Sequence, residues 1–170
     1  MMIPEVNPQH ADVIVFQRQN RGRDTGSIAV KPNCSIQSFV PPLDALKEYG
    51  LHAVSVVTSQ ALSGAGRIPA TWPEMEDNVI PFILGEEDKT EREPLKIWGR
   101  IEEGKIIPAE GPIISATCTR VPVTDGHMAF VTVSFDVKPT RSDIIRAFEV
   151  YNQRNPIREL DLPSAPAQFI

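Results

Sequence analysis

The sequence contains little cysteine, no excess of basic charge and no long apolar run. Its two cysteines, Cys34 and Cys118, lie far apart, which fits neither a metal site nor the disulfide scaffold of a secreted protein. We therefore expect free thiols, no bound metal and a location in the reducing cytoplasm.

Charge and hydropathy argue against two kinds of partner. The formal net charge is -5 at pH 7, and the arginines of residues 18–23 are interspersed with polar side chains. Nucleic acid is not an expected partner, because binding to its backbone needs concentrated positive charge. A membrane is not expected either, since no apolar run approaches the roughly 18 residues that span a bilayer, and no signal-peptide pattern is visible.

The residues that are present suffice for one domain. Hydrophobic residues make up 41% of the 170, and domains of about 100–200 residues usually hold a single core. Proline is frequent, with 16 residues against a usual frequency of about 5%, which stiffens loops and strand ends. Strands and helices alternate without an internal repeat, so the expected class is mixed α and β.

The first part of the chain is predicted to contain two strands around a helix. The apolar run of residues 27–30 predicts a buried strand, followed by a sharp turn and a helix that begins at Cys34. Gly50 should end this helix, and the proline pair at 41–42 should kink it or divide it into two. The β-branched residues of 52–58 predict a core strand.

Loops and helices are expected to dominate two later regions. Residues 67–85 are predicted to be mostly loop, and the charge-rich residues 86–101 to be helical with a solvated outer face. Thr140 or Ser142 should cap a last helix, because hydroxyl side chains accept the free N–H groups of a first turn. The tail from residue 155 is expected to be loop.

Two strands, residues 114–123 and 127–137, are predicted to form a hairpin around an Asp-Gly pair. In that register one shared face is apolar except for Arg120 and His127. These residues would lie roughly 13 Å apart along the strands, with space for a small anion between them. Two interpretations stay open: a substrate site, or a structural pair satisfied by neighbouring carboxylates.

Three motifs carry a resemblance to a known family. They are Pro32-Asn33-Cys34, Gln60 followed by Ser63-Gly64-Ala65-Gly66, and the segment Arg120-Val-Pro-Val-Thr-Asp-Gly-His127. Together they resemble the aspartate-semialdehyde dehydrogenases, especially the archaeal and fungal type, over essentially all 170 residues. The resemblance implies an α/β (α+β) domain like the catalytic domain of glyceraldehyde-3-phosphate dehydrogenase, with a mixed, largely antiparallel sheet and helices on one face.

The resemblance implies roles for catalytic residues. Cys34 matches the nucleophile, expected at a helix N-terminus, where the helix dipole stabilises a thiolate. His127 matches the general acid and base, since imidazole accepts and returns protons near neutral pH. Gln60 would orient the substrate. Cys118, His10 and His52 are interpreted as structural or surface residues.

Binding residues follow from the same resemblance. Arg120 would hold the substrate carboxylate through paired hydrogen bonds, and Glu86 would meet the substrate ammonium. Lys89 matches a phosphate or substrate contact on the same helix face, and Asn33 borders this pocket. The loop Ser63-Gly64-Ala65-Gly66 would approach the nicotinamide of NADP.

The implied reaction is the NADPH-dependent reduction of L-aspartyl 4-phosphate to L-aspartate 4-semialdehyde through a cysteine thioester, in lysine, threonine and methionine biosynthesis. The family further implies phosphate as a second small molecule, no metal, and a homo-oligomer, either a dimer or a tetramer. One enzyme alternative is a malonyl-CoA reductase, which uses the same thioester chemistry on a coenzyme A substrate. The other alternative is a non-catalytic dimerisation fragment.

The sequence departs from the family pattern at both ends. No Gly-rich dinucleotide-binding turn precedes residue 27. We interpret residues 1–170 as a catalytic and dimerisation segment that lacks the N-terminal Rossmann unit and the C-terminal closing segment. Weak or no activity of the chain alone is expected, because hydride transfer requires a positioned cofactor.

Overall fold

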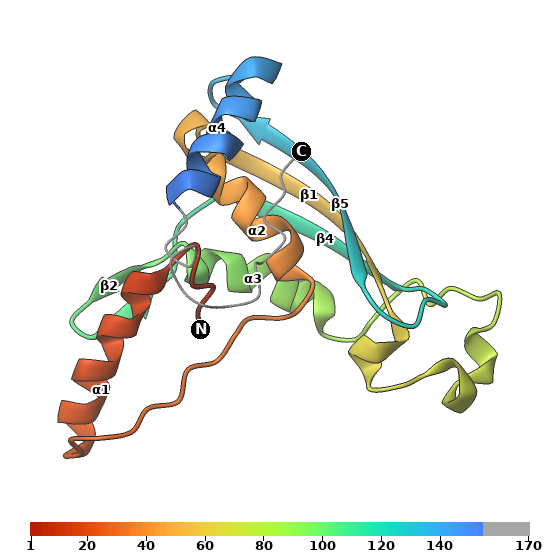
Figure 1. Cartoon of the computed structure of the whole chain (residues 1–170), viewed down its shortest axis with the longest axis horizontal. Coiled ribbons are helices and arrows are strands. Elements are labelled where there is room, and N and C mark those ends of the chain that lie inside the picture. Colours follow the sequence, from red (N-terminus) through yellow and green to blue (C-terminus); the bar gives the residue numbers. More distant parts are fainter. Residues whose placement is uncertain (155–170) are drawn as a thin grey trace.

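The computed structural model describes residues 1–154, and its centre is a sheet with helices on one face (Figure 1). The loop expected from residue 155 lies outside the described residues. The helices are α1 (Val13–Arg21), α2 (Ile36–Ala45), α3 (Glu86–Ile97) and α4 (Arg141–Arg154). The strands are β1 (Leu51–Gln60), β2 (Arg100–Glu102), β3 (Lys105–Ile107), β4 (Ile113–Arg120) and β5 (His127–Phe135).

β1 is the central strand of the main sheet, whose order is β4-β1-β5. It runs parallel to β4 and antiparallel to β5, while β2 and β3 form a separate antiparallel pair. Figure 1 shows α2 and α3 against the sheet, with α1 pointing away from it. The predictions of a mixed α and β domain and of a core strand at 52–58 are therefore confirmed.

The predicted hairpin between β4 and β5 is wrong, because β1 lies between them. Their connection crosses the end of β1, where the N–H groups of Leu62 and Ser63 donate to the carbonyl oxygens of Val123 and Thr124 at 2.8 and 3.1 Å. A two-residue turn cannot span two strand spacings, which are about 10 Å. The Asp-Gly pair is therefore one part of a longer connection.

Arg120 and His127 nevertheless share one face of the sheet, as predicted, because β1 pairs in register with both outer strands. Gln60 of β1 pairs with Arg120 on one side and with His127 on the other. Four residues earlier, Val56 is beside Ala116. Alternate residues of all three strands therefore point to one face, against which α2 and α3 pack.

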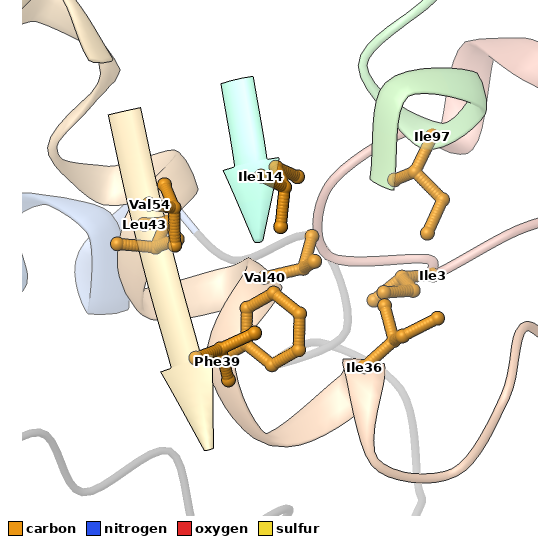
Figure 2. Close-up of a cluster of buried hydrophobic side chains, with 9 residues drawn as sticks. Ile3, Ile36, Phe39, Val40, Leu43, Val54, Ile97 and Ile114 are labelled. Atoms are coloured by element: carbon orange, nitrogen blue, oxygen red, sulfur yellow. The ribbon is translucent and has the colours of Figure 1, made fainter. Parts of the chain in front are cut away.

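The hydrophobic core lies between this face and the helices. Figure 2 shows side chains from β1, β4, α2, α3 and the N-terminal segment gathered into one cluster. Its buried members are Ile3, Ile36, Phe39, Val40, Leu43, Val54, Val56, Ile97 and Ile114. The α2 members recur at three- and four-residue spacing, which is the period of one helical face.

The helix signals in the sequence are confirmed at α4 and only partly at α2. Pro41 and Pro42 lie inside α2, so the predicted division into two helices at these prolines is wrong. α2 ends at Ala45 instead of Gly50, which follows a separate 3-10 turn, Lys47–Tyr49. At the start of α4, Thr140 Oγ1 accepts a hydrogen bond from the Asp143 N–H at 3.2 Å, and Asp143 Oδ2 accepts one from the Thr140 N–H at 2.8 Å. This reciprocal cap identifies Thr140, rather than Ser142, as the capping residue.

Residues 27–30 do not form the buried strand that their sequence predicts. Ile28 is 89% exposed, and within the described chain the segment has no neighbouring strand. The Val30 carbonyl accepts a hydrogen bond from the Met2 N–H at 2.9 Å. An extended segment of this kind becomes a strand only when neighbours satisfy its backbone groups.

Two further features differ from expectation. α3 ends at Ile97 instead of continuing to residue 101, and the β2–β3 pair that follows was not predicted. Gly99 lies between α3 and β2. It packs so closely on the Ile107 backbone that a side chain would have no space there. None of the helices in the described residues is long and apolar enough to cross a membrane.

Candidate active site

One end of the sheet brings together three residues that the sequence singles out. Gln60, at the end of β1, lies between Arg120 on β4 and His127 on β5. Arg120 and His127 therefore lie about 10 Å apart across the strands, and the expected separation of roughly 13 Å along a hairpin is wrong. Gln60 and Arg120 are buried, and His127 is half-buried.

Cys34 lies in space beside His127, at the same end of the sheet. Its turn directly precedes α2, and its Sγ is 3.0 Å from Nε2 of His127, although the two residues are 93 positions apart. The N-terminus of α2 supplies partial positive charge near the sulfur. A nucleophile in hydrogen-bond contact with a base is the arrangement that covalent catalysis requires.

The His127 ring has a partner for Nδ1 in either protonation state. The Ala61 N–H lies 3.1 Å from Nδ1 and the Gly126 carbonyl oxygen lies at the same distance. A neutral ring with its proton on Nδ1 donates to the Gly126 carbonyl and leaves Nε2 free to accept the Cys34 proton, whereas a ring that accepts from Ala61 carries its proton on Nε2. This environment suits a residue that gains and loses a proton.

Arg120 is 5% exposed, and its Nη1 donates a hydrogen bond to the Ala61 carbonyl at 2.8 Å. Among residues 1–154, no carboxylate forms an ion pair with Arg120 or His127. The described residues therefore do not supply the carboxylates that the interpretation as a structural pair requires. The guanidinium retains donors for an anionic ligand.

The loop of residues 63–66 lies against these side chains. A Cβ atom added at Gly64 would lie 2.8 Å from Arg120 Nη1 and 3.0 Å from His127 Cε1. Only glycine therefore permits this close approach without displacing one of the two side chains. Residues 63–66 are exposed, so a ligand can reach the loop from solvent.

Glu86, at the start of α3, joins the site to the turn of Cys34. One carboxylate oxygen accepts from Asn33 Nδ2 at 2.7 Å and Gln60 Nε2 at 3.2 Å, and the other accepts from Lys89 Nζ at 3.0 Å. Burial raises the pKa of Glu86, but hydrogen bonds from Lys89, Asn33 and Gln60 outweigh it and hold this pKa below the ordinary value. Glu86 is therefore ionised at neutral pH.

Lys89 lies at the solvent side of the same carboxylate. Its hydrogen bond to Glu86 and the charge of Glu86 raise the pKa of Lys89 above the ordinary value, and its side chain is half exposed. It therefore presents an ammonium to solvent beside Glu86. Glu86 and Lys89 are more than an isolated exposed helix pair, because Glu86 also binds Asn33 and Gln60.

The remaining candidate residues lie away from this site. Cys118 is fully buried, with its Sγ 3.6 Å from Thr90 Oγ1. His10 is buried between the Asn7 side chain and the Gly99 carbonyl, while His52 is exposed. Among the described residues, no group of three or more His, Cys, Asp or Glu side chains could hold a metal ion.

Sequence reasoning missed two residues that shape the site. Ala61 bonds to His127 through its N–H and to Arg120 through its carbonyl. Its position directly after Gln60 was the available signal. Glu93 accepts a hydrogen bond from the Asn33 N–H at 2.8 Å, and its spacing of two helical turns from Glu86 could have indicated a shared face.

Comparisons with known proteins show what the chain is similar to. Residues 42–168 match the protein family described as "Semialdehyde dehydrogenase, dimerisation domain". Aspartate-semialdehyde dehydrogenase from Archaeoglobus fulgidus is 45% identical over 170 residues, covering 100% of this chain and 47% of that protein. The enzyme from Cryptococcus neoformans is 43% identical over 178 residues, covering 100% of this chain and 48% of that protein.

A solved structure also resembles the chain. The aspartate semialdehyde dehydrogenase of Candida albicans, crystallised with NADP, has a TM-score of 0.72 and 33% identity, covering 86% of this chain and 43% of that one. The chain spans about half the length of the curated relatives it matches. From the family match, this sequence identity and the shared fold, the chain belongs to the aspartate-semialdehyde dehydrogenase family.

Proposed function

We propose that residues 1–170 carry the catalytic and dimerisation segment of an NADPH-dependent aspartate-semialdehyde dehydrogenase. The N-terminal Rossmann unit and the C-terminal closing segment of such an enzyme would lie outside residues 1–170. The observation that carries the proposal is the 3.0 Å contact between Cys34 Sγ and His127 Nε2. A cytoplasmic location stays a prediction from the sequence.

Cys34 would form the covalent bond to the substrate. His127 accepts the thiol proton, the sulfur attacks the acyl carbon of L-aspartyl 4-phosphate, and the carbon–oxygen bond breaks as phosphate leaves with the electron pair. The product of this step is a thioester on Cys34. When the aldehyde is released after reduction, the carbon–sulfur bond breaks, and His127 lies in position to stabilise the returning thiolate.

Substrate recognition would use the charges around this pair. Arg120 has free donors for the substrate carboxylate, and Glu86 is an ionised acceptor for its ammonium. Lys89, which is half exposed beside Glu86, would contact phosphate. An ionised Glu86 favours aspartyl phosphate over malonyl-CoA, because the malonyl group has no ammonium to pair with it.

NADPH, when bound, supplies the hydride that reduces the thioester. The loop of residues 63–66 fits a position beside the nicotinamide, since it is exposed and packs without a side chain at Gly64 against Arg120 and His127. No Gly-rich dinucleotide-binding turn precedes residue 27. We therefore expect weak or no turnover by the chain alone.

A homo-oligomer is proposed as well, because the sheet face opposite the core exposes apolar side chains. Val57, Met128 and Phe130 are 40%, 58% and 59% exposed, and they lie on adjacent strands. Such a patch is typical of an interface. A fragment that only dimerises would share this face, so oligomeric state alone does not distinguish it from an enzyme.

Acyl transfer to Cys34 tests the proposed function without requiring NADPH. The chain would be incubated with L-aspartyl 4-phosphate or malonyl-CoA, and the acyl group located by mass spectrometry of the intact and digested protein. We expect an aspartyl adduct on Cys34, none in Cys34→Ser, and a large decrease in His127→Ala. Malonyl labelling in its place would support the reductase alternative, and no labelling by either donor would support a non-catalytic fragment.

A further inference from the structure

α3 contacts the turn that carries Cys34 through two carboxylates. Glu86 accepts from Asn33 Nδ2 at 2.7 Å, and Glu93 accepts from the Asn33 backbone N–H at 2.8 Å. Glu86 and Glu93 are seven positions apart, which is two turns along one side of a helix. Asn33, the residue directly before Cys34, is therefore held from one face of α3.

A second pair of carboxylates on α3 points to β4. Glu87 accepts from the Cys118 N–H at 3.2 Å, and Glu91 accepts from the Ala116 N–H at 3.1 Å. These residues are four positions apart and share a different side of the helix. α3 therefore connects the Cys34 turn with the strand that ends at the substrate-facing Arg120.

The Asn33 turn is also closed locally. Its Oδ1 accepts a hydrogen bond from the Ser35 N–H at 2.9 Å, so the Asn33 side chain spans Cys34. The position of the whole turn relative to α3 then depends on the bonds to Glu86 and Glu93. The contact of Glu93 is to the backbone, so it constrains the path of the chain, whereas Glu86 holds only the side chain.

We propose that Glu93 is a positioning residue for Cys34, and that it holds the sulfur in contact with His127 by fixing the backbone at Asn33. Among the described residues, Glu93 has a hydrogen bond to Asn33 and none to Cys34 or His127, so it acts through the turn. The inference rests on the proposed function, because it assigns Glu93 a role in presenting the nucleophile of that reaction.

The charge and the hydrogen bond of Glu93 have opposite effects on Cys34, which makes the inference testable. A carboxylate near the sulfur disfavours a thiolate, so removing only its charge should leave alkylation of Cys34 unchanged or faster. Removing the hydrogen bond frees the turn and moves the sulfur away from His127. Only a positioning role therefore predicts that alkylation of Cys34 becomes slower when the hydrogen-bond acceptor at residue 93 is lost.

The experiment measures the alkylation rate of Cys34 by iodoacetamide across a pH series of roughly 5 to 9, bracketing thiol ionisation. Glu93→Leu removes the acceptor, and Glu93→Gln keeps an acceptor oxygen without the charge. Glu91→Leu is the matched control, because it removes an equivalent carboxylate bond to a backbone N–H on the β4 side of the same helix. Thermal unfolding of each variant is measured in parallel.

For Glu93→Leu we expect alkylation at pH 7 to be roughly tenfold slower, the change that a one-unit shift of the pH profile produces. Glu93→Gln should react at least as fast as the wild type, and Glu91→Leu should keep the wild-type profile even if it unfolds at a lower temperature. The inference is overturned if Glu93→Leu reacts as fast as the wild type, or if Glu91→Leu slows Cys34 equally.

His127→Ala in the same assay separates this inference from the proposed function. If the wild-type rate does not depend on His127, the Cys34–His127 pair is not functional and the proposed function fails. If the rate depends on His127 but not on the acceptor at residue 93, the proposed function stands and only the role of Glu93 is wrong.

Discussion

β1 and the segment of residues 27–30 are both extended and rich in apolar side chains, yet their surroundings differ. Val56 of β1 is 1% exposed, whereas Val30 is 52% exposed. β1 has a hydrogen-bonded strand on each side and helices against one face, whereas 27–30 has no neighbouring strand within the described residues. Apolar sequence therefore supplies the tendency to be buried, and the neighbours decide whether burial occurs.

The same contrast extends to the helices. We call residues 12–30 the arm, and the sheet with α2, α3 and α4 the body. In the body, Phe39 of α2 is 2% exposed, but in the arm Phe16 of α1 is 41% exposed. Substitutions in the body should therefore change stability much more than the same substitutions in the arm.

The largest difference is expected for phenylalanine. Phe39→Ala should lower the free energy of unfolding by about 3–5 kcal/mol, because it leaves a cavity in the core. Phe16→Ala should lower it by about 1 kcal/mol or less, since that ring is already partly hydrated. Urea unfolding followed by circular dichroism measures both. Equal losses would show that the arm packs as tightly as the body.

A matched pair of valines gives a smaller effect. Val56→Ala should cost about 2 kcal/mol of unfolding free energy through lost burial and a small cavity. Val30→Ala should stay within about 0.5 kcal/mol of the wild type, as exposed positions generally do. The midpoints of urea unfolding test this comparison, and a large loss for Val30→Ala would contradict the exposed position of 27–30.

Helix caps provide the third comparison. Thr140→Ala should lower the unfolding free energy by about 1 kcal/mol, because it removes the hydroxyl that caps α4. Ser142→Ala, two residues away, is the control and should change little. In the arm, Asp12 precedes α1 without a side-chain cap bond, so Asp12→Ala should also be close to neutral. Thermal melts of the three variants decide the order.

The smallest effect is the pH dependence contributed by Glu86. Its folded pKa lies below the ordinary value of 4.5, so its contribution to stability is present above that value and is lost as pH falls through the folded pKa. Glu86→Gln should therefore lower the unfolding free energy at pH 7, by under about 1 kcal/mol because the glutamine keeps an oxygen that can accept the hydrogen bonds of Asn33 and Gln60.

The difference between wild type and Glu86→Gln should disappear at acidic pH. Urea unfolding at pH 7 and at pH values below 4.5 measures this difference directly. Asp24→Asn, at an exposed position of the arm, is the matched control and should show no such trend. A difference for Glu86→Gln that grows with acidity would contradict the assigned sign.

Part of the candidate site could be predicted from the sequence. Alternation on the two outer strands placed Arg120 and His127 on one face, because side chains of a strand alternate whichever strand lies beside it. The motif around Cys34 marked this residue as the candidate nucleophile before its neighbours were known. The order of strands could not be predicted, since the Asp-Gly turn is a local signal and the insertion of β1 depends on pairing across distant residues.

Hydrogen bonds within the site that involve backbone groups could not be predicted either. The bonds of Ala61 to Arg120 and His127 depend on a main-chain N–H and carbonyl, which every residue has except for the proline N–H. The bond from Asn33 to Glu93 spans 60 positions. The spacing of Glu93 from Glu86 indicates a shared helix face, but no pattern in the sequence identifies Asn33 as the partner of Glu93.

The sequence by itself determined which residues are candidates for the site, which segments favour helix or strand, and which sides of β4 and β5 are apolar. These properties follow from side-chain type and from the local period of each element. Only the tertiary structure decided that β1 separates β4 from β5, that 27–30 is exposed, and that Cys34 meets His127. Those outcomes depend on contacts between distant residues, whose energies are shared across the whole packed body.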